Sequence, residues 1–216
     1  MVFYEPHRRD RSLLPHDPFK AIIAPRPIGW VTTQSAKGEI NLAPYSYFNA
    51  FADRPPIIAF CSQEYKDSVT FAAETGEFVW NMPTFELREA MNMTAAPLDR
   101  GDSEPDFAGL AMAPSRLVAP PRVAASPAAL ECKLIEIKRL RTQAGTEINF
   151  WLVFGEVVGV HLDEAYIKDG LLDMAAMRPI ARCGYDEYVV ADRVFTMERP
   201  PKPPAAAAET STMTKG

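Results

Sequence analysis

The sequence predicts a mainly β protein, built as an antiparallel barrel with a few covering helices. Many short β-branched runs are separated by turn residues, only two short helical patterns occur, and no strand–helix–strand rhythm repeats. With 216 residues, of which 47% are hydrophobic, the chain can bury one sizeable core. We therefore expect one domain at 19–198, an N-terminal arm at 1–18, and a proline- and alanine-rich tail at 199–216 that is disordered.

The first strands follow from a hairpin pattern. The β-branched run Ile28–Thr33 is joined to Ile40–Leu42 by the turn residues Ala36–Glu39. Pro44 is expected at a sheet edge or a strand end, because proline donates no ladder hydrogen bond. An irregular segment then leads to a strand at Ile57–Ser62.

Two helices are expected next. Asp67 or Ser68 can cap the N-terminus of the first helix, and Gly76 can end it in a left-handed conformation. Thr84 can cap a second helix, Phe85–Met93. The charged segment that follows, Ala96–Gly109, is expected to be a surface loop and, if it covers a site, a specificity lid.

The strongest strand patterns come late in the chain. The alternation in Leu130–Ile137 changes phase near Leu134, which predicts a β-bulge there. Phe150–Val160 is apolar almost throughout, which is typical of a strand covered on both faces. Leu162–Met177 is expected to be a short helical insertion. Two final strands are then predicted, Ile180–Cys183 and Tyr188–Val190.

Composition excludes several classes of function. A net charge of −5 without a lysine or arginine cluster disfavours nucleic-acid binding. Cys61, Cys132 and Cys183 are odd in number and form no CxxC pair, and His7 and His16 lie in the arm, so we expect neither disulfides nor a metal site. The charged N-terminus lacks a signal-peptide core and no apolar run could span a membrane, so a cytoplasmic protein without membrane contact is expected.

Small polar side chains and aromatic rings concentrate in the stretch 25–68. Serine, threonine and asparagine satisfy backbone groups at strand ends more often than they bind ligands. The same stretch would also suit a planar heteroaromatic ligand, which needs apolar walls and a few fixed polar groups. Lys66, Asp67 and Ser68 are either a solvated pair that caps a helix or a phosphate site at its N-terminus. Both alternatives stay open at this point.

Five segments together carry a resemblance: Arg26–Thr33, Asn41–Asn49, Pro55–Pro56, Lys66–Ser68 and Gly155–His161. In this order they resemble the flavin reductase-like, FMN-binding split-barrel family, over about Phe19–Val190. The resemblance implies a six-stranded Greek-key split barrel and a homodimer with FMN at or near the subunit interface. It also implies reduction by NADH or NADPH.

The resemblance also suggests roles for single residues. It implies that Thr32 and Thr33 lie against the flavin ring and that Ser46 and Asn49 hold the ring edge or the ribityl chain. The group that would bind the phosphate is Ser62, Lys66 and Ser68, and Asp67 is counted with the cofactor-binding residues. His161 is either a satisfied strand-end residue or a catalytic group that orients the nicotinamide or donates a proton. For Arg178, Arg182 and Tyr185, an approach to the cofactor and ordinary surface packing remain equal alternatives.

Three functions therefore remain. In the first, an FMN-dependent oxidoreductase takes hydride from NAD(P)H and passes electrons to a flavin, a ferric chelate or another acceptor, with a monooxygenase as a possible partner that receives reduced flavin. In the second, the FMN enzyme has a dedicated small organic substrate. In the third, the protein binds flavin without turnover. The acceptor is not legible in the residues, because the hydride chemistry belongs to the cofactor.

Overall fold

The computed structural model describes residues 1–99 and 101–201, so most of the predicted tail lies outside the described residues. Its centre is a seven-stranded antiparallel sheet of order β3-β2-β6-β9-β10-β5-β4. The strands are β2 (Gly29–Gln34), β3 (Ile40–Tyr45), β4 (Phe48–Asp53), β5 (Pro56–Gln63), β6 (Glu77–Asn81), β9 (Ala128–Arg141) and β10 (Glu147–Leu162). The predicted hairpin is present as β2 and β3, and Pro44 lies on edge strand β3.

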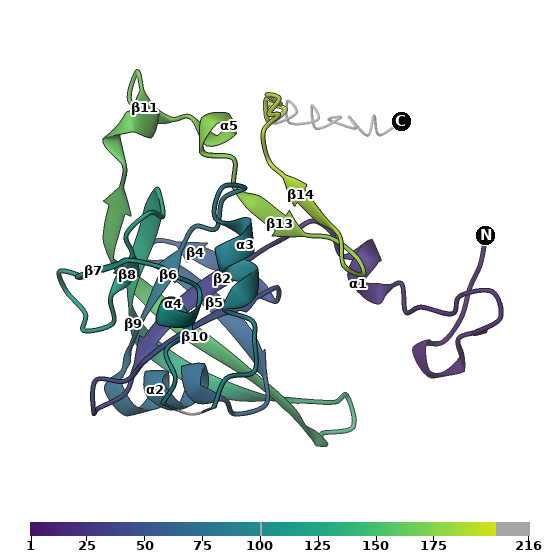
Figure 1. Cartoon of the computed structure of the whole chain (residues 1–216). Helices are drawn as coiled ribbons and strands as arrows, with labels where there is room; N and C mark the ends of the chain where they lie inside the picture. Colours follow the sequence, from purple (N-terminus) through teal and green to yellow (C-terminus); the bar gives the residue numbers. More distant parts are fainter. Residues whose placement is uncertain (100, 202–216) are drawn as a thin grey trace, which may run out of the picture.

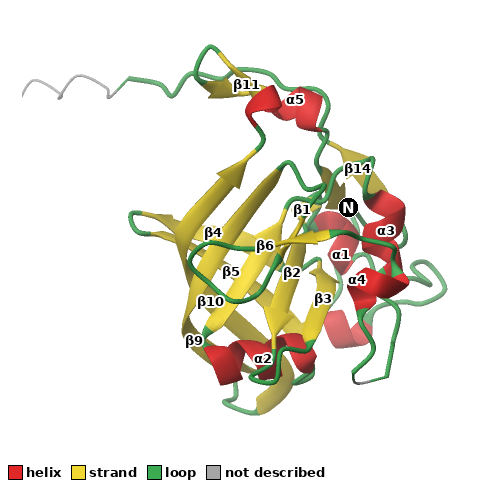
Figure 2. Ribbon diagram, turned by 60° about the vertical axis from the view of Figure 1, so that its left-hand side comes forward, coloured by secondary structure: helices red, strands yellow, loops and turns green. Residues whose placement is uncertain are grey.

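The connection between β3 and β4 shows that the sheet is closed. The two strands lie at opposite edges of the sheet, yet only Ser46 and Tyr47 separate them. A chain spans at most about 3.6 Å per residue, so the two edges must meet and the sheet curls into a barrel (Figure 2). Across the barrel, the ring of Phe48 stacks on that of Trp80 with centroids 5.7 Å apart. The predicted antiparallel split barrel is thus confirmed.

The sheet has one strand more than the resemblance implies. The additional strand is β4, which occupies the segment expected to be irregular before Ile57. Asn49 pairs with Ala59, and the register then shifts between Ala50 and Ala52. Because β4 pairs with a strand that is itself buried in the barrel wall, tertiary pairing overrides the weak local strand signal.

The barrel interior is packed with side chains from most of its strands. Val31, Phe60, Phe78 and Val153 are each fully buried in one cluster. Gly155 of β10 makes this packing possible, since a Cβ there would lie 2.4 Å from the Phe78 ring. A larger residue at this position would force the ring out of the core.

Helix α2 (Asp67–Thr75) covers one end of the barrel (Figure 2) and ends at Gly76, whose φ of 72° is left-handed as predicted. The expected cap was wrong: the N-cap residue is Lys66, and no side chain caps the helix. Helix α3 (Arg88–Met93) is shorter than predicted. Residues 85–87 form a turn in which the Leu87 N–H donates to the Thr84 carbonyl at 3.1 Å, and the α-helix begins only at Arg88.

Strands β9 and β10 form the long hairpin of the barrel. The predicted bulge is confirmed, because Phe154 pairs with Glu136 and Gly155 with Leu134, which leaves Ile135 without a partner residue. Within a single chain, β10 is not covered on both faces along its whole length. Its pairing with β5 ends at Glu156, and beyond that point its side chains alternate between half-buried and exposed.

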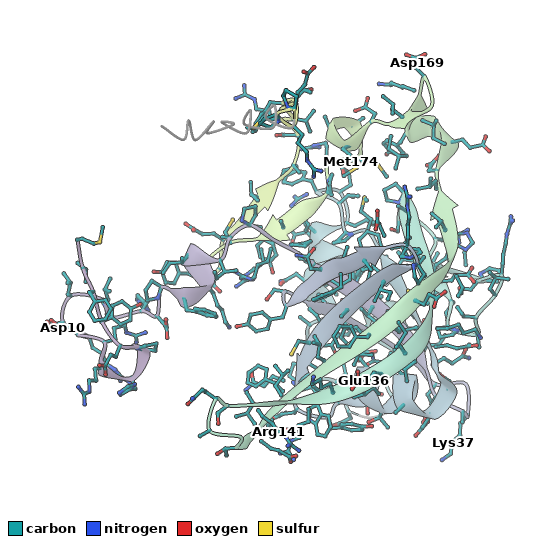
Figure 3. The ribbon with its side chains drawn as sticks, turned by 180° about the vertical axis from the view of Figure 1, so that it is seen from behind. Asp10, Lys37, Glu136, Arg141, Asp169 and Met174 are labelled. Carbon is teal, nitrogen blue, oxygen red and sulfur yellow. The ribbon has the colours of Figure 1, made fainter. Side chains whose placement is uncertain are left out.

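The segment 163–177 is not the helical insertion that was predicted. It contains η2 (Glu164–Tyr166), a small hairpin of β11 (Ile167–Lys168) and β12 (Leu171–Leu172), and the short helix α5 (Met174–Met177). Asp169 and Gly170 both have positive φ, which suits a tight two-residue hairpin turn. Asp169 marks the tip of this hairpin, and Lys37 lies at the opposite end of the molecule (Figure 3).

The final strands are confirmed but form a separate sheet, in which β13 (Ile180–Arg182) lies between β1 (Arg26–Pro27) and β14 (Tyr188–Val190). The remaining elements are η1 (Pro6–Arg8), α1 (Phe19–Ile22), α4 (Glu104–Phe107), β7 (Met112–Ala113) and β8 (Arg122–Val123). The N-terminal arm extends away from the barrel (Figure 1), and α4 lies within the expected loop 96–109. Among the described residues, none of the helices has the length and apolar character needed to cross a membrane.

Candidate functional site

A groove of about 290 Å³ runs along the outside of the barrel, where β4 and β5 meet β1 and β10. We call it the barrel groove. Phe48, Cys61 and Leu152 line it with apolar surface, and Ser46 and Asn49 contribute its polar side chains. Two of the predicted cofactor residues are thus brought together, because the β3–β4 connection and the start of β4 lie on this face.

A second depression, of about 250 Å³, adjoins the groove and shares Arg26 and Ser46 with it. Its other walls come from α1, α3 and the β13–β14 connection, and they include Lys20, Arg182 and Tyr188. We call it the cationic pocket. No acidic residue is among the described residues that line it.

Arg26 lies between the groove and the pocket and is only 6% exposed. Its guanidinium donates to three backbone carbonyls: those of Lys20, of Ile23 at 2.6 Å and of Cys183 at 2.8 Å. Its Nε is buried without a hydrogen-bond partner. A buried guanidinium that contacts only neutral carbonyls keeps an uncompensated positive charge.

Four other predicted residues are buried and do not line the groove. Each is at most 1% exposed: Thr32, Thr33, Ser62 and Ser68. The Ser68 hydroxyl oxygen accepts hydrogen bonds from Asn41 Nδ2 and from the Tyr45 hydroxyl, both at 2.7 Å. Burial raises the pKa of Tyr45, so this hydroxyl stays a donor. The network fixes the first turn of α2 against the hairpin.

The other hydroxyls of this group also have internal partners. Thr32 accepts from Asn81 Nδ2 at 2.9 Å, and Ser62 donates to the carbonyl of Glu64 at 2.9 Å. These bonds tie β2 to β6 and hold the turn that follows β5. Within one chain, these side chains therefore shape the wall behind the site.

The start of α2 presents one cation to solvent. The Lys66 side chain is 62% exposed, and its ammonium lies 3.9 Å from Glu64, a distance at which an exposed ion pair is weak. Burial raises the pKa of Glu104, and the nearby negative charge of Asp67 raises it further. Lys66 is thus the residue of the predicted phosphate group whose side chain is free to meet a ligand.

His161 belongs to a different cluster. Its Nε2 lies 2.5 Å from Oε1 of Glu131, a carboxylate with 0% exposure that also accepts the N–H groups of Arg116 at 2.7 Å and Leu117 at 2.6 Å. Burial acts to raise the pKa of Glu131, but the hydrogen bonds from His161 and the two backbone groups outweigh it and hold this pKa below its usual value. We call this set the Glu131–His161 cluster.

The pairing registers separate this cluster from the barrel groove. Pro44, Trp30, Asn81, Ala129 and His161 lie in one row across β3, β2, β6, β9 and β10. In the other direction around the closed barrel, Leu152 of β10 lines the groove, but His161 lies nine residues further along the same strand, about 30 Å away at 3.3 Å per residue. Its own depression shares no residue with the groove. A single chain does not bring His161 to Ser46 and Asn49.

Two cations at this site were not singled out from the sequence. Arg26 was noted only as part of a motif, and Lys20 fell inside the expected domain 19–198 without a role of its own. One signal could have found Arg26: it is a charged residue held between Pro25 and Pro27, directly before a strand that is buried throughout. Lys20 carries no comparable local signal, because it reaches the pocket only through the fold.

Comparison with known proteins agrees with this architecture. A family model described as "Flavin reductase like domain" matches residues 23–179. The uncharacterized protein BH2278 of Halalkalibacterium halodurans is 33% identical over 183 residues, which cover 82% of this chain and 87% of that protein.

Two solved structures are similar in both sequence and fold. Nitrilotriacetate monooxygenase component B from Bacillus cereus is 29% identical with a TM-score of 0.83, and the match covers 91% of this chain and 98% of that one. The 2-nitrobenzoate 2-nitroreductase NbaA of Pseudomonas fluorescens is 28% identical with a TM-score of 0.74, over 87% and 91% of the two chains. Because the family model matches well over half of a chain that folds as its split-barrel relatives do, this chain belongs to the flavin reductase-like domain family.

Proposed function

We propose that this protein is an FMN-dependent oxidoreductase that takes hydride from NADH or NADPH and passes electrons to a second acceptor. The family match supports a flavin-associated oxidoreductase. The observation that carries the finer proposal is the barrel groove, where Ser46 and Asn49 stand among apolar walls next to an uncompensated guanidinium. When bound, the flavin supplies the hydride and electron chemistry.

The residues of the groove fit a flavin ring. A planar heteroaromatic needs apolar surface for its faces, which Phe48 and Leu152 provide, and a few polar groups for its edge, which Ser46 and Asn49 provide. Arg26 adds a fixed positive charge at the end of the groove, and its orphaned Nε is a donor that a ligand can satisfy after a small movement. In the proposal, Thr32 and Thr33 hold the strands behind the ring.

The phosphate of FMN is assigned to the first turn of α2. The first N–H groups of a helix have no partner within the helix and favour an anion. Lys66 brings an exposed ammonium to the same turn. Asp67 and Ser68 belong to the turn itself, and Ser62 lies near the end of β5, which precedes it. A single compact phosphate position favours FMN over FAD.

We propose a homodimer whose partner subunit covers the outer face of β10. Val158, Val160 and Leu162 expose 37%, 61% and 41% of their surface at the end of this strand, and Leu171 exposes 75% in the adjacent hairpin. Apolar surface of this kind is usually covered by a partner. The dimer would also decide whether His161 of one subunit reaches the groove of the other. Light scattering at micromolar protein is expected to give twice the chain mass, and a monomer with FMN bound would contradict the dimer.

The acceptor remains the finer part of the proposal. Nitrilotriacetate monooxygenase component B is by its name one component of a larger system, which supports a partner monooxygenase that receives reduced flavin. A dedicated organic substrate is the second candidate. It is favoured by the cationic pocket beside the groove, and the nitroreductase relative acts on 2-nitrobenzoate according to its name.

One experiment tests the redox proposal directly. The purified protein, loaded with FMN, is mixed anaerobically with NADH or NADPH while flavin absorbance is followed. We expect the flavin absorbance to bleach within seconds and to return when an acceptor is added. Mass spectrometry of the released cofactor should give FMN. Stoichiometric FAD would contradict the cofactor assignment. If neither nucleotide bleached the FMN-loaded protein, the protein would bind flavin without turnover and the redox proposal would fail.

A further inference from the structure

The charge of the cationic pocket is opposite to that of the chain. The sequence carries 28 acidic and 23 basic residues, a net charge of −5. The pocket nevertheless gathers Lys20, Arg26 and Arg182 and has no carboxylate among the described residues that line it. Concentrated charge of one sign in a concave site draws ligands of the opposite sign.

The three cations are also poorly neutralised by the protein itself. Arg26 contacts only carbonyl oxygens, as described above. Lys20 makes no ion pair within the described part of the chain, and its ammonium lies 5.9 Å from the centre of the Tyr47 ring. Arg182 has Asp186 at 3.1 Å, but that carboxylate is fully exposed and therefore well screened. An anionic ligand would complete the charge balance that the fold leaves open.

The remaining walls suit a flat ring. The Arg182 guanidinium lies over the Tyr188 ring, 4.5 Å from the ring centre. The Tyr188 hydroxyl accepts a hydrogen bond from Arg182 at 2.5 Å. Tyr185 has a φ of 54°, a conformation that a large side chain rarely adopts, and Arg182 donates to its carbonyl. The pocket volume of about 250 Å³ lies below the roughly 300–1,000 Å³ of sites for drug-sized ligands. A single ring fits this space.

We propose that the cationic pocket binds the carboxylate of a single-ring aromatic acid, which is then the second ligand of the site beside the flavin. Arg182 and Lys20 bind the carboxylate directly, and the buried positive charge of Arg26 attracts it. Tyr188 packs against the ring. Ser46, shared by the pocket and the groove, places this ligand next to the flavin position. The inference rests on the proposed function for its second ligand, but the pocket itself is part of the single chain.

Calorimetry with two matched probes tests the proposal. Benzoate and benzamide have nearly the same shape and differ in charge, and each is titrated into the FMN-loaded protein and into the protein without flavin. We expect benzoate to bind at least tenfold more tightly than benzamide, since a charge-assisted hydrogen bond is about twice as strong as a neutral one. Raising the salt concentration should weaken benzoate binding alone.

Three variants locate the binding. Lys20→Met should weaken benzoate about two- to fivefold, as expected for an exposed charge. Arg182→Gln should weaken it about tenfold or more, with partial rescue by Arg182→Lys. Benzamide binding should change little in each of them. Lys37→Met is the matched control, because Lys37 is an exposed lysine at the far end of the molecule (Figure 3) and should leave both probes unchanged.

Several results would overturn the proposal. Equal affinity for the two probes would show that the carboxylate is not recognised. Equal effects of Lys20→Met and Lys37→Met would show that benzoate does not bind in the cationic pocket. If Lys20→Met weakened NADPH but not benzoate, the pocket would belong to the electron donor. Flavin content and anaerobic bleaching are measured on the same samples. A protein that bleaches normally without a benzoate preference sinks this inference alone, whereas one that binds benzoate but never flavin sinks the proposed function.

Discussion

The barrel groove with its cationic pocket and the Glu131–His161 cluster are both polar and partly buried, but they differ in how their polar groups are satisfied. Glu131 accepts two backbone N–H groups and contacts His161, so its carboxylate has a full set of partners within the chain. Within residues 1–99 and 101–201, Arg26 has a buried Nε without a partner and no counter-charge. A satisfied cluster stabilises the fold, whereas an unsatisfied one is prepared for a ligand. Partner satisfaction therefore separates the two regions better than residue type does.

The largest expected effect is in the satisfied cluster. Glu131→Ala would leave two backbone N–H groups and His161 unpaired, and it should lower the free energy of unfolding by about 3–5 kcal/mol. Chemical denaturation measures this. Glu136→Ala is the control, since Glu136 lies exposed on the same strand and should change stability by less than about 0.5 kcal/mol. Similar losses of unfolding free energy in Glu131→Ala and Glu136→Ala would show that the partners of Glu131 do not stabilise the fold.

At the site, Lys66→Ala should act on the ligand and not on the fold. We expect flavin binding to weaken by about 1.5–3 kcal/mol, because a charge-assisted contact with the phosphate is lost, with little change in the unfolding free energy. Ser68→Ala should instead lower the unfolding free energy and change flavin binding little, since Asn41 and Tyr45 lose their shared acceptor. Fluorescence titration of FMN together with denaturation curves compares the two. An unchanged FMN affinity in Lys66→Ala would show that the phosphate does not bind at the first turn of α2.

His161→Ala tests whether the satisfied cluster has a second role. From its contacts alone, we expect a loss of about 1–3 kcal/mol in stability with flavin content retained. His161→Gln, which keeps a donor, should recover part of the loss. Stopped-flow traces of flavin reduction and reoxidation, taken on the folded and FMN-loaded variants, decide on catalysis. A drop of about a hundredfold in either rate would assign His161 to the active site, which requires the partner subunit to bring it to the groove.

The smallest effect is a pH dependence. Because the folded pKa of Glu131 lies below its ordinary value, the carboxylate contributes stability that is fully present above its unfolded pKa, about 4.3, and is lost as the pH falls through the folded pKa. The difference in unfolding free energy between the natural protein and Glu131→Gln should therefore shrink as the pH is lowered from about 5 to 3. A difference independent of pH would show that the carboxylate is not ionised in the native state.

Local patterns in the sequence were sufficient for much of the fold. The hairpin of β2 and β3, the end of α2 at Gly76 and the bulge beside Leu134 were all predicted, because each depends on turn chemistry or alternation over a few residues. Two of the failures were β4 and the 163–177 hairpin. The first depends on pairing with β5, and the second replaced an expected helix with two very short strands around Asp169 and Gly170.

The site was predictable only in its position along the chain. The stretch 25–68 does form the barrel groove, and Ser46 and Asn49 do lie in it. The sequence could not show that Thr32, Thr33, Ser62 and Ser68 are buried, because Thr32 and Thr33 face opposite sides of the sheet and the packing on each side comes from distant segments. The roles of these residues toward FMN stay predictions.

By itself, then, the sequence determined the strand-rich class, the turns and the family, all of which are written in short segments and their order. Only the tertiary structure decided which polar groups meet. Lys20 and Arg26, near the start of the chain, meet Arg182 of β13 at one pocket, while His161 lies far along β10 from Leu152, the residue of that strand that lines the groove. Such neighbours depend on register and long-range pairing, and no local pattern encodes either.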